Sequence, residues 1–313
     1  MAVKISEITY KNFGRCIRME NSFVELVITI DIGPRIIRYS IKGGDNFFYE
    51  DKGRKSKQDA KAMADYYGKG ACWYIYGGHR IWVAPEYLPQ TYFPDNSRVA
   101  YKVVGSRTVV FTPPPQRKNG LQFVLEVTLD EYDCNVTVKN SITNIGEIEQ
   151  TYSVWALTVL AAGGMEIVPL NRHDTGFLNN KLMAVWPYCN LSDKRAAFST
   201  EMMMLKQDKK VPSNFKIGTD NRRGWSAYVY KDAMFVKHFD YIDGAVYPDG
   251  GMNFETYTCP SFLEMESLSP LMKIAPGNTL THVEKWDIID DVKMPKLGDF
   301  AAVESLVHKF IGK

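Results

Sequence analysis

Two adjoining segments, residues 121–130 and 133–143, constrain the fold of this chain more than any other feature of its sequence. Apolar residues recur at alternate positions along both segments (FVLEVTLDEYDCNVTVKNSITN). Because successive side chains of a strand point to opposite faces, this pattern predicts two strands, each with one buried face. The polar stretch Glu-Tyr-Asp at 131–133 separates them as a turn would. We therefore expect an antiparallel hairpin at this place.

Further strands are expected along most of the chain, because Gly and Asp clusters interrupt the apolar runs about every eight to twelve residues. Residues 150–160 are almost continuously apolar, which is typical of a strand that is buried on both faces. The other segments with a strand pattern are residues 24–30, 35–41, 101–104, 107–112, 225–230, 233–238, 252–258, 261–268 and 279–288.

These segments predict a mostly-β fold with about sixteen or more strands in two large, curved antiparallel sheets. No repeat or low-complexity linker interrupts the chain, so we expect one domain over residues 1–313. We interpret residues 51–66 as a surface loop with one or two helical turns, and residues 169–224 as long loops over a sheet. A short helix is expected at the C-terminus, where Asp299 can cap apolar residues that recur at helical spacing from Phe300 to Ile311.

The charge balance narrows the class of partner. The chain has 38 basic and 36 acidic residues, a net charge of +2. Nucleic acids and anionic membranes both require clustered Lys and Arg, so we expect neither as a partner. No run of about 18 apolar residues is present, and no membrane span is expected. Aromatic residues make up 13% of the chain, which suits a ligand with flat apolar faces such as a sugar ring.

The five cysteines are scattered and no pair has CxxC spacing. We interpret them as free thiols in a reducing compartment, and the first residues lack the apolar core of a signal peptide. The sequence therefore predicts a cytoplasmic protein. No cluster of residues has the spacing of metal ligands, and no cofactor-binding motif occurs. We expect neither a metal nor a cofactor.

The stretch Gly-Gly-His-Arg-Ile-Trp-Val-Ala-Pro-Glu at 77–86 is the first candidate site. Paired glycines let the backbone turn sharply or approach a ligand closely. On a strand His79 lies on one face, while Arg80 and Trp82 lie on the other. We interpret His79, Arg80 and Glu86 as site residues. Trp82 is either a core residue or a surface for a sugar ring to stack against.

A second candidate is the pair Glu264 and Glu266, whose spacing puts both carboxylates on the same side of a strand. Neighbouring like charges repel, so one carboxyl group should have a raised pKa unless a cation lies nearby. A raised pKa suits a general base. The alternative is a solvated polar face opposite Leu263 and Met265. A third candidate is the pair Lys237 and His238, at the end of a predicted strand.

Three stretches carry a resemblance to a known family: VELVITIDIGPRIIRYSIKGGDNFFYE, GGHRIWVAPE and LEMESLSPLMKIAPGNTLTHVEKWDI. Together they resemble the galactose mutarotase (aldose 1-epimerase) superfamily, in one of its uncharacterised bacterial branches. In that family a late strand carries the catalytic Glu, often as Leu-Glu followed shortly by Pro. A Pro-Gly…Trp stretch then follows, here Pro276, Gly277 and Trp286. The resemblance implies a β-supersandwich and a cofactor-free reaction at the anomeric carbon of a sugar.

In the reaction that the resemblance implies, a Glu removes the proton of the C1 hydroxyl while a His protonates the ring oxygen. The ring opens, the C1–C2 bond rotates, and the reverse steps give the other anomer. Glu264 matches the base of the Leu-Glu motif, and Glu266 is the alternative on the same face. The stretch that matches the family's acid strand, residues 152–158, has Trp155 at about that place and no histidine. His79 or His238 is then the candidate acid.

Three functions stay open at this point. The first is an aldose 1-epimerase-like enzyme in which Arg80 binds a hydroxyl or carboxylate and Trp82 or Trp155 forms a stacking floor. The second is a carbohydrate-binding protein without catalysis. The third is a sugar-phosphate mutarotase, which would need several cations in the cleft. The candidates for those cations are Arg35, Arg80 and Lys237.

Overall fold

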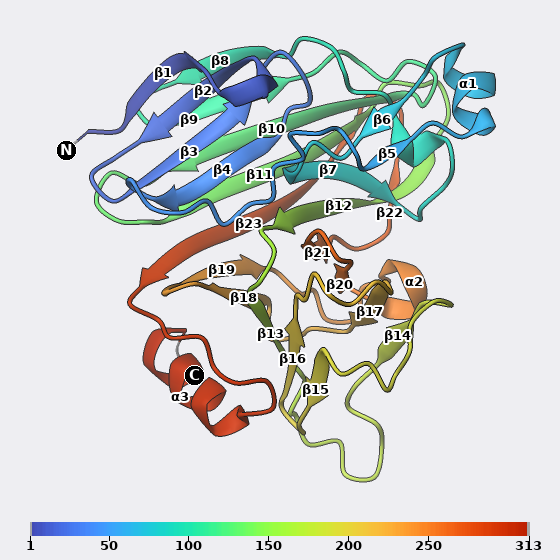
Figure 1. Cartoon of the computed structure of the whole chain (residues 1–313). Coiled ribbons are helices and arrows are strands. Elements are labelled where there is room, and N and C mark those ends of the chain that lie inside the picture. Colours follow the sequence, from blue (N-terminus) through green and yellow to red (C-terminus); the bar gives the residue numbers. More distant parts are fainter. Residues whose placement is uncertain (1, 312–313) are drawn as a thin grey trace.

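The computed structural model describes residues 2–311 and consists mainly of two large β-sheets, in which all paired strands are antiparallel (Figure 1). Within residues 2–311, one sheet has 11 strands, the other has 10, and a small sheet has two. This confirms the predicted fold class, a mostly-β chain with large antiparallel sheets and a short C-terminal helix.

The 11-stranded sheet is ordered β1-β2-β3-β4-β7-β12-β21-β20-β17-β14, and β22 pairs with β12 beside this path. Its strands are β1 (Lys4–Thr9), β2 (Arg15–Glu20), β3 (Val24–Thr29), β4 (Ile36–Ile41), β7 (Gly78–Ala84), β12 (Gln150–Leu160), β14 (Met183–Val185), β17 (Phe215–Thr219), β20 (Phe254–Thr258), β21 (Leu263–Leu268) and β22 (Met272–Ile274).

The 10-stranded sheet is ordered β15-β16-β13-β18-β19-β23-β11-β10-β9-β8. Its strands are β8 (Ala100–Val104), β9 (Thr108–Thr112), β10 (Leu121–Leu129), β11 (Val136–Asn144), β13 (Met165–Pro169), β15 (Ala196–Phe198), β16 (Met202–Lys206), β18 (Trp225–Tyr230), β19 (Ala233–Phe239) and β23 (Thr279–Asp290). The two-stranded sheet pairs β5 (Lys57–Gln58) with β6 (Trp73–Tyr74).

The predicted hairpin is confirmed as β10 and β11, which pair from Leu121 with Asn144 to Leu129 with Val136. Along β10 every second residue is buried, as the alternation indicates. The continuously apolar strand is confirmed as β12, whose residues 153–160 are all buried. The main apolar core includes side chains of both large sheets, among them Tyr39 from one sheet and Trp286 from the other.

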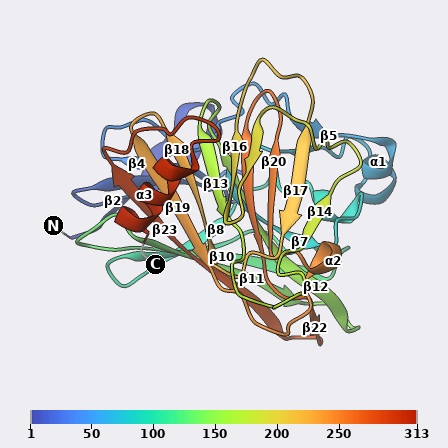
Figure 2. The ribbon, with the colours of Figure 1, turned by 90° about the horizontal axis from the view of Figure 1, so that it is seen from below.

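Helices are few and short: α1 (Lys61–Tyr67), α2 (Pro248–Gly251) and α3 (Phe300–Phe310), with 3₁₀ turns at Lys11–Phe13 and Gln90–Tyr92. The predicted C-terminal helix is confirmed as α3, and the Asp299 side chain accepts a hydrogen bond from the Ala302 backbone N–H. Val303 and Val307 of α3 belong to an apolar cluster that includes residues of β18 and β19. Figure 2 shows α3 beside these two strands and α2 near β14.

The prediction of long loops over residues 169–224 is wrong in part, because β14, β15, β16 and β17 lie within this range. The reason is burial. Four of the five residues of β16 and all five of β17 are buried, so these strands lack the alternation that reveals a strand with one exposed face. The predicted loop 51–66 contains β5 and the start of α1.

Gly77 and Gly78 place the start of β7. Both have positive φ, +107° and +63°, where L-residues are strained. A Cβ atom on Gly77 would lie 1.9 Å from the Tyr49 carbonyl oxygen, and one on Gly78 would lie 2.1 Å from that of Ile36. The paired glycines therefore allow a close approach of backbone to backbone.

Among the described residues, no helix is long and apolar enough to cross a membrane.

Candidate functional site

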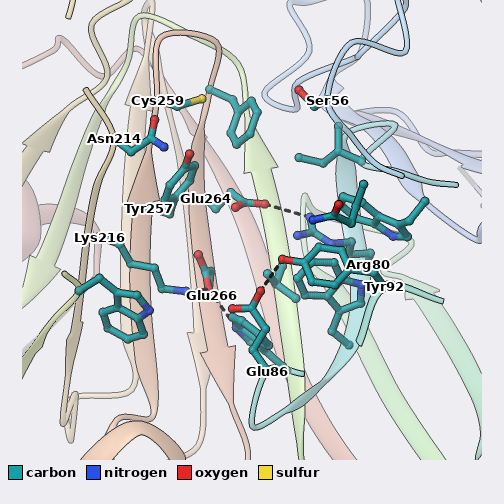
Figure 3. A pocket seen from close by; sticks show the side chains of 18 of the residues that line it. Ser56, Arg80, Glu86, Tyr92, Asn214, Lys216, Tyr257, Cys259, Glu264 and Glu266 are labelled. Atoms are coloured by element: carbon teal, nitrogen blue, oxygen red, sulfur yellow. Dashed lines mark hydrogen bonds and ion pairs between the residues drawn. The ribbon is translucent and has the colours of Figure 1, made fainter. Parts of the chain in front are cut away.

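A cavity of about 610 Å³ opens on one face of the 11-stranded sheet. Its floor is formed by neighbouring strands β7, β12, β21, β20 and β17, and its rim includes residues 56–58 and the Trp186–Tyr188 segment (Figure 3). A volume of this size is ordinary for a small-molecule site. The polar side chains at its floor come from segments that lie far apart in the sequence.

Strand register determines which side chains reach this cavity. Leu157 of β12 is paired with Arg80 on one side and with Glu266 on the other. Directly paired residues of adjacent strands project from the same face of a sheet, so the side chains of Leu157, Arg80 and Glu266 share the cavity face. The neighbours of Arg80 on the same strand, His79 and Ile81, project from the opposite face.

Arg80 and Glu264 form an ion pair at the floor of the cavity. The Arg80 Nη1 atom lies 2.9 Å from Glu264 Oε1, and the exposed fractions of the two residues are 2% and 8%. The guanidinium group lies over the rings of Trp82 and Trp73, 4.3 and 5.3 Å from their centroids. Burial raises the pKa of Glu264 above its ordinary value, the Arg80 charge opposes this shift, and the charge of Glu266 adds to it.

A second group of charges surrounds Lys216 of β17. Its Nζ atom lies 2.9 Å from Glu266 Oε2 and 2.7 Å from Glu255 Oε2. The same Glu266 oxygen accepts a hydrogen bond of 3.0 Å from the Trp155 indole N–H. Burial lowers the pKa of Lys216, but the carboxylates of Glu266 and Glu255 outweigh it, so the pKa lies above its ordinary value. Lys216 is therefore a cation at neutral pH.

Aromatic side chains form a large part of the cavity lining. The aromatic lining residues are Trp73, Trp82, Tyr92, Trp155, Trp186, Tyr188, Tyr257 and Phe262. Aromatic rings provide large apolar faces, and their Tyr and Trp members carry a polar group at one end. The Tyr92 hydroxyl donates a hydrogen bond to Glu86, which also lines the cavity (Figure 3). Such a lining suits a flat ligand that carries many hydroxyl groups.

Six of the residues singled out in the sequence lie together in this cavity: Arg80, Trp82, Glu86, Trp155, Glu264 and Glu266. Four others do not line it: Arg35, His79, Lys237 and His238. In the described residues 2–311, which contain every histidine of the chain, no histidine lines the cavity.

His79 is fully buried between the two large sheets. Its Nδ1 atom lies 2.9 Å from Thr158 Oγ1, and its Nε2 atom lies 3.0 Å from Asn140 Oδ1. Burial lowers the pKa of His79 to about 4, so the imidazole is neutral at physiological pH. In this position His79 has no access to the cavity, because it projects from the opposite face of β7.

Lys237 lies in the same buried layer as His79. Its ammonium group donates to the backbone carbonyls of Ala156 (3.2 Å) and Met265 (3.1 Å) and lies 2.8 Å from Glu284 Oε1. Burial opposes ionisation of Glu284, but the Lys237 charge, with contributions from nearby histidines, lowers the pKa of Glu284 to about 2. The hydrogen bonds of Lys237 to these two carbonyls therefore join the two sheets, away from the cavity.

The remaining two candidates, Arg35 and His238, lie outside the cavity. Arg35 is buried and forms an ion pair with Asp95, with 2.6 Å between Nη1 and Oδ2. His238 lies on β19 of the other large sheet, and burial lowers its pKa. Within residues 2–311, no group of three or more His, Cys, Asp or Glu side chains is arranged to hold a metal ion.

Two charged residues of the site, Lys216 and Glu255, are not among the candidates from the sequence. Glu255 is fully buried on β20, directly opposite Glu266 of β21. A signal for Lys216 was present in the segment Phe-Lys-Ile-Gly-Thr at 215–219. A single lysine within an apolar run indicates a buried cation that needs a carboxylate partner. The tyrosine and tryptophan residues of the rim carried no comparable signal.

Comparison with known proteins gives a likeness in structure but none in sequence. No family model matches the chain, and no curated protein matches it. A galactose mutarotase-like protein from Lactobacillus casei superposes with a TM-score of 0.56 at 10% identity, covering 88% of this chain and 100% of that one. One from Clostridium acetobutylicum superposes with a TM-score of 0.52 at 13% identity, covering 92% and 99%. This is the galactose mutarotase-like fold.

The fold also occurs within a larger protein. A TPR-domain containing protein from Parabacteroides distasonis superposes with a TM-score of 0.60 at 15% identity, covering 91% of this chain. The present chain spans about half of that protein's length, 49%. At such low identities these likenesses establish the galactose mutarotase-like fold and nothing about the reaction.

Proposed function

We propose that this protein binds a sugar in the cavity and interconverts its anomers, with Glu264 as the general base. The observation that carries the proposal is the Arg80–Glu264 pair, which lies at the floor of an aromatic-lined cavity of about 610 Å³. The galactose mutarotase-like fold supports it, and so does the position of Glu264 in the Leu-Glu motif of β21.

Glu264 suits the role of base better than Glu266. A base needs a carboxylate that reaches the substrate and a pKa close to the working pH. Glu264 is 8% exposed, and the pKa of its carboxyl group is raised by burial. Glu266 is 1% exposed, and its Oε2 atom is held by both the Trp155 indole and Lys216. We therefore assign Glu266 to positioning Lys216, and Glu264 to proton transfer.

In the proposed reaction, the Glu264 carboxylate takes the proton of the hydroxyl group on C1. A carbonyl forms at C1, the bond between C1 and the ring oxygen breaks, and the ring oxygen gains a proton. Rotation about the C1–C2 bond and reversal of these steps give the other anomer. Arg80 holds the Glu264 carboxylate in place, and the rings of Trp82 and Trp155 in turn hold Arg80 and Lys216.

An uncharged sugar fits this cavity better than a sugar phosphate. Each cation that lines it has a carboxylate partner: Arg80 with Glu264, Lys216 with Glu266, and Lys57 with Asp59 at 2.5 Å. A phosphate would have to compete with these carboxylates for every cation, at a cost in desolvation and repulsion. The other cations suggested for phosphate binding, Arg35 and Lys237, lie elsewhere.

A second candidate function is sugar binding without turnover. One observation favours it: the described residues that line the cavity include no histidine. In this alternative Glu264 and Arg80 serve only to hold hydroxyl groups by hydrogen bonds.

The deciding experiment is to measure anomer interconversion by NMR on a panel of free aldoses, with the wild type beside Glu264→Gln and Glu266→Gln. We expect Glu264→Gln to lose about 10²-fold or more in turnover with a modest change in binding. Saturable binding of a sugar with no acceleration on any member of the panel would favour the second candidate. Acceleration that survives in Glu264→Gln would refute the assignment of the base.

A further inference from the structure

Lys216 has hydrogen-bonding capacity that its protein partners do not use. An ammonium group has three N–H donors. Two carboxylate oxygens lie within reach of Nζ, Glu266 Oε2 at 2.9 Å and Glu255 Oε2 at 2.7 Å, and the structure gives no third acceptor within residues 2–311. Lys216 is 5% exposed and lines the cavity. One N–H is therefore available to a ligand.

The ammonium group is confined to a narrow place in the cavity. It lies between the faces of two indole rings, 4.7 Å from the centroid of Trp155 and 4.6 Å from that of Trp186. Neither ring can accept a conventional hydrogen bond from it, and both hold it against the two carboxylates. The donor is thus directed by its surroundings before any ligand enters, which is how an effective electrostatic group is arranged.

Lys216 also lies at a suitable separation from Glu264. The register pairs Lys216 with Tyr257 and Tyr257 with Glu264, so one strand separates the two residues. At a strand spacing of about 4.8 Å their Cα atoms are about 10 Å apart. Both side chains project into the same cavity (Figure 3). A ring placed between them would meet a base on one side and a cationic donor on the other.

We propose that Lys216 is the proton donor to the ring oxygen of the sugar. This inference rests on the proposed function and assigns its second catalytic group. As Glu264 takes the proton from the C1 hydroxyl, the C1–O bond to the ring breaks and its electron pair goes to the ring oxygen. That oxygen takes a proton from the Lys216 ammonium group, which becomes an amine. In the reverse step the amine recovers this proton and Glu264 returns its own to the oxygen on C1.

The two carboxylates beside Lys216 explain how it is restored. They favour the ammonium form over the amine, so the proton returns to Lys216 when the ring closes. The raised pKa of Lys216 has the same cause. A ring-opened alkoxide is a stronger base than an amine and can take a proton even from such a group. Lys216 therefore remains charged over a wide range of pH.

Two tyrosine hydroxyls are the rival donors. Tyr188 and Tyr257 line the cavity, and burial raises the pKa of both. A neutral hydroxyl is a weaker hydrogen-bond donor than an ammonium group. The ammonium group is therefore the stronger candidate for the donor.

The test compares Lys216→Met with the wild type on a sugar that the wild type turns over. We expect a loss of about 10²–10⁴-fold in kcat, with sugar binding changed much less. Lys102→Met, an exposed lysine on β8 of the other sheet, is the control and should keep wild-type rates. Because Lys216→Met leaves two buried carboxylates without a cation, the double variant Lys216→Met/Glu255→Gln is made in parallel to preserve folding.

Chemical rescue separates a donor from a merely structural lysine. In Lys216→Ala, added methylammonium should fill the vacated space and restore part of the turnover, with a rate that depends on the pKa of the amine used. Wild-type turnover on a sugar, with Lys216→Met or the double variant within threefold of it, would overturn this inference and leave the proposed function intact. A wild type that turns over no sugar would instead overturn the proposed function, and this inference with it.

Discussion

Two buried lysines, Lys237 and Lys216, meet opposite faces of the 11-stranded sheet and have different surroundings. Lys237 reaches the sheet from β19, and its three N–H groups have three acceptors, two backbone carbonyls and Glu284. Lys216 belongs to the sheet, and its ammonium group contacts two carboxylates beside an open cavity. The two lysines are similar in burial, with exposed fractions of 0% and 5%.

The difference lies in how completely each charge is satisfied. A buried polar group whose hydrogen bonds are all made within the protein specifies and rigidifies the fold. A buried polar group with a donor left over and a cavity in front of it is available to a ligand. Burial and charge alone do not distinguish these cases. The number of hydrogen-bond acceptors around each ammonium group does distinguish them. It separates the polar layer between the sheets from the polar floor of the cavity.

The largest effect is expected on stability, at Lys237. Lys237→Met removes the cation from Glu284, which is fully buried and has its pKa lowered to about 2 mainly by this lysine. An uncompensated buried carboxylate should cost about 3–5 kcal/mol in the free energy of unfolding. Denaturant unfolding measures this cost. If Lys237→Met unfolds at the same denaturant concentration as the wild type, the polar layer does not hold the sheets together.

The next effect concerns pH and His79. In the folded state the pKa of His79 is lowered to about 4 by burial, against 6.5 for an ordinary histidine. Between pH 6.5 and 4 the unfolded chain therefore binds a proton that the folded chain does not, so stability falls as pH falls. The loss is about 1.4 kcal/mol per pH unit, or about 3 kcal/mol in all. Above pH 6.5 the histidine does not make the free energy of unfolding depend on pH.

The measurement for His79 is the free energy of unfolding from pH 4 to 8, with His79→Gln beside the wild type. His282 is buried in the same layer and its pKa is also lowered to about 4, so the variant should retain part of the slope. His308→Gln, on the surface helix α3, is the matched control. Sugar binding should be the same in all three proteins. Weakened binding in His79→Gln at pH 7, with folding intact, would contradict the separation of the two faces.

A smaller effect is expected on the pH dependence of turnover in Arg80→Met. The Arg80 charge opposes the rise in the pKa of Glu264 that burial causes. Without it the pKa should rise further, so the base becomes protonated at a higher pH. As the pH is lowered, turnover of the variant should therefore begin to fall at a higher pH than turnover of the wild type. A pH–rate profile that keeps its acid limb in place would show that Arg80 does not act on Glu264.

The smallest effect is expected in the choice of ligand. Because the cations of the cavity are paired with carboxylates, a neutral aldose should bind at least as tightly as its phosphate ester, and its affinity should change little with salt. Isothermal titration with both ligands at two ionic strengths measures this. Tighter, salt-sensitive binding of the phosphate ester would show that a phosphate can replace the carboxylates as the partner of these cations.

The sequence predicts strands in which apolar residues alternate with polar ones, and it predicts the start of a helix from its capping residue. The β10–β11 hairpin, the buried strand β12 and the cap of α3 at Asp299 are of this kind. The parity of β7 also separates His79 from Arg80. The alternation of faces along a strand does not say which face packs against the second sheet. Both residues were therefore candidates for one site.

The grouping of Lys216 and Glu255 with Glu266 could not be predicted from the sequence, for a different reason. The strand of Lys216 is buried on both faces, so no alternation marks it. The contact of Lys216 with Glu255 and Glu266 depends on the register of three strands. That register follows from the packing of the whole sheet. Residues of a site that come from strands with one exposed face are therefore easier to predict than residues that come from fully buried strands.

The close approach of backbone at Gly77 and Gly78 has a practical consequence for anyone who wishes to change the ligand of this cavity. Arg80 is reached only two residues beyond a point where the chain has no room for a single added carbon atom. Variation there would displace the strand and destroy the site before it could alter specificity. Libraries should leave these two positions fixed and diversify the rim at residues 56–58, where new side chains would meet solvent and ligand.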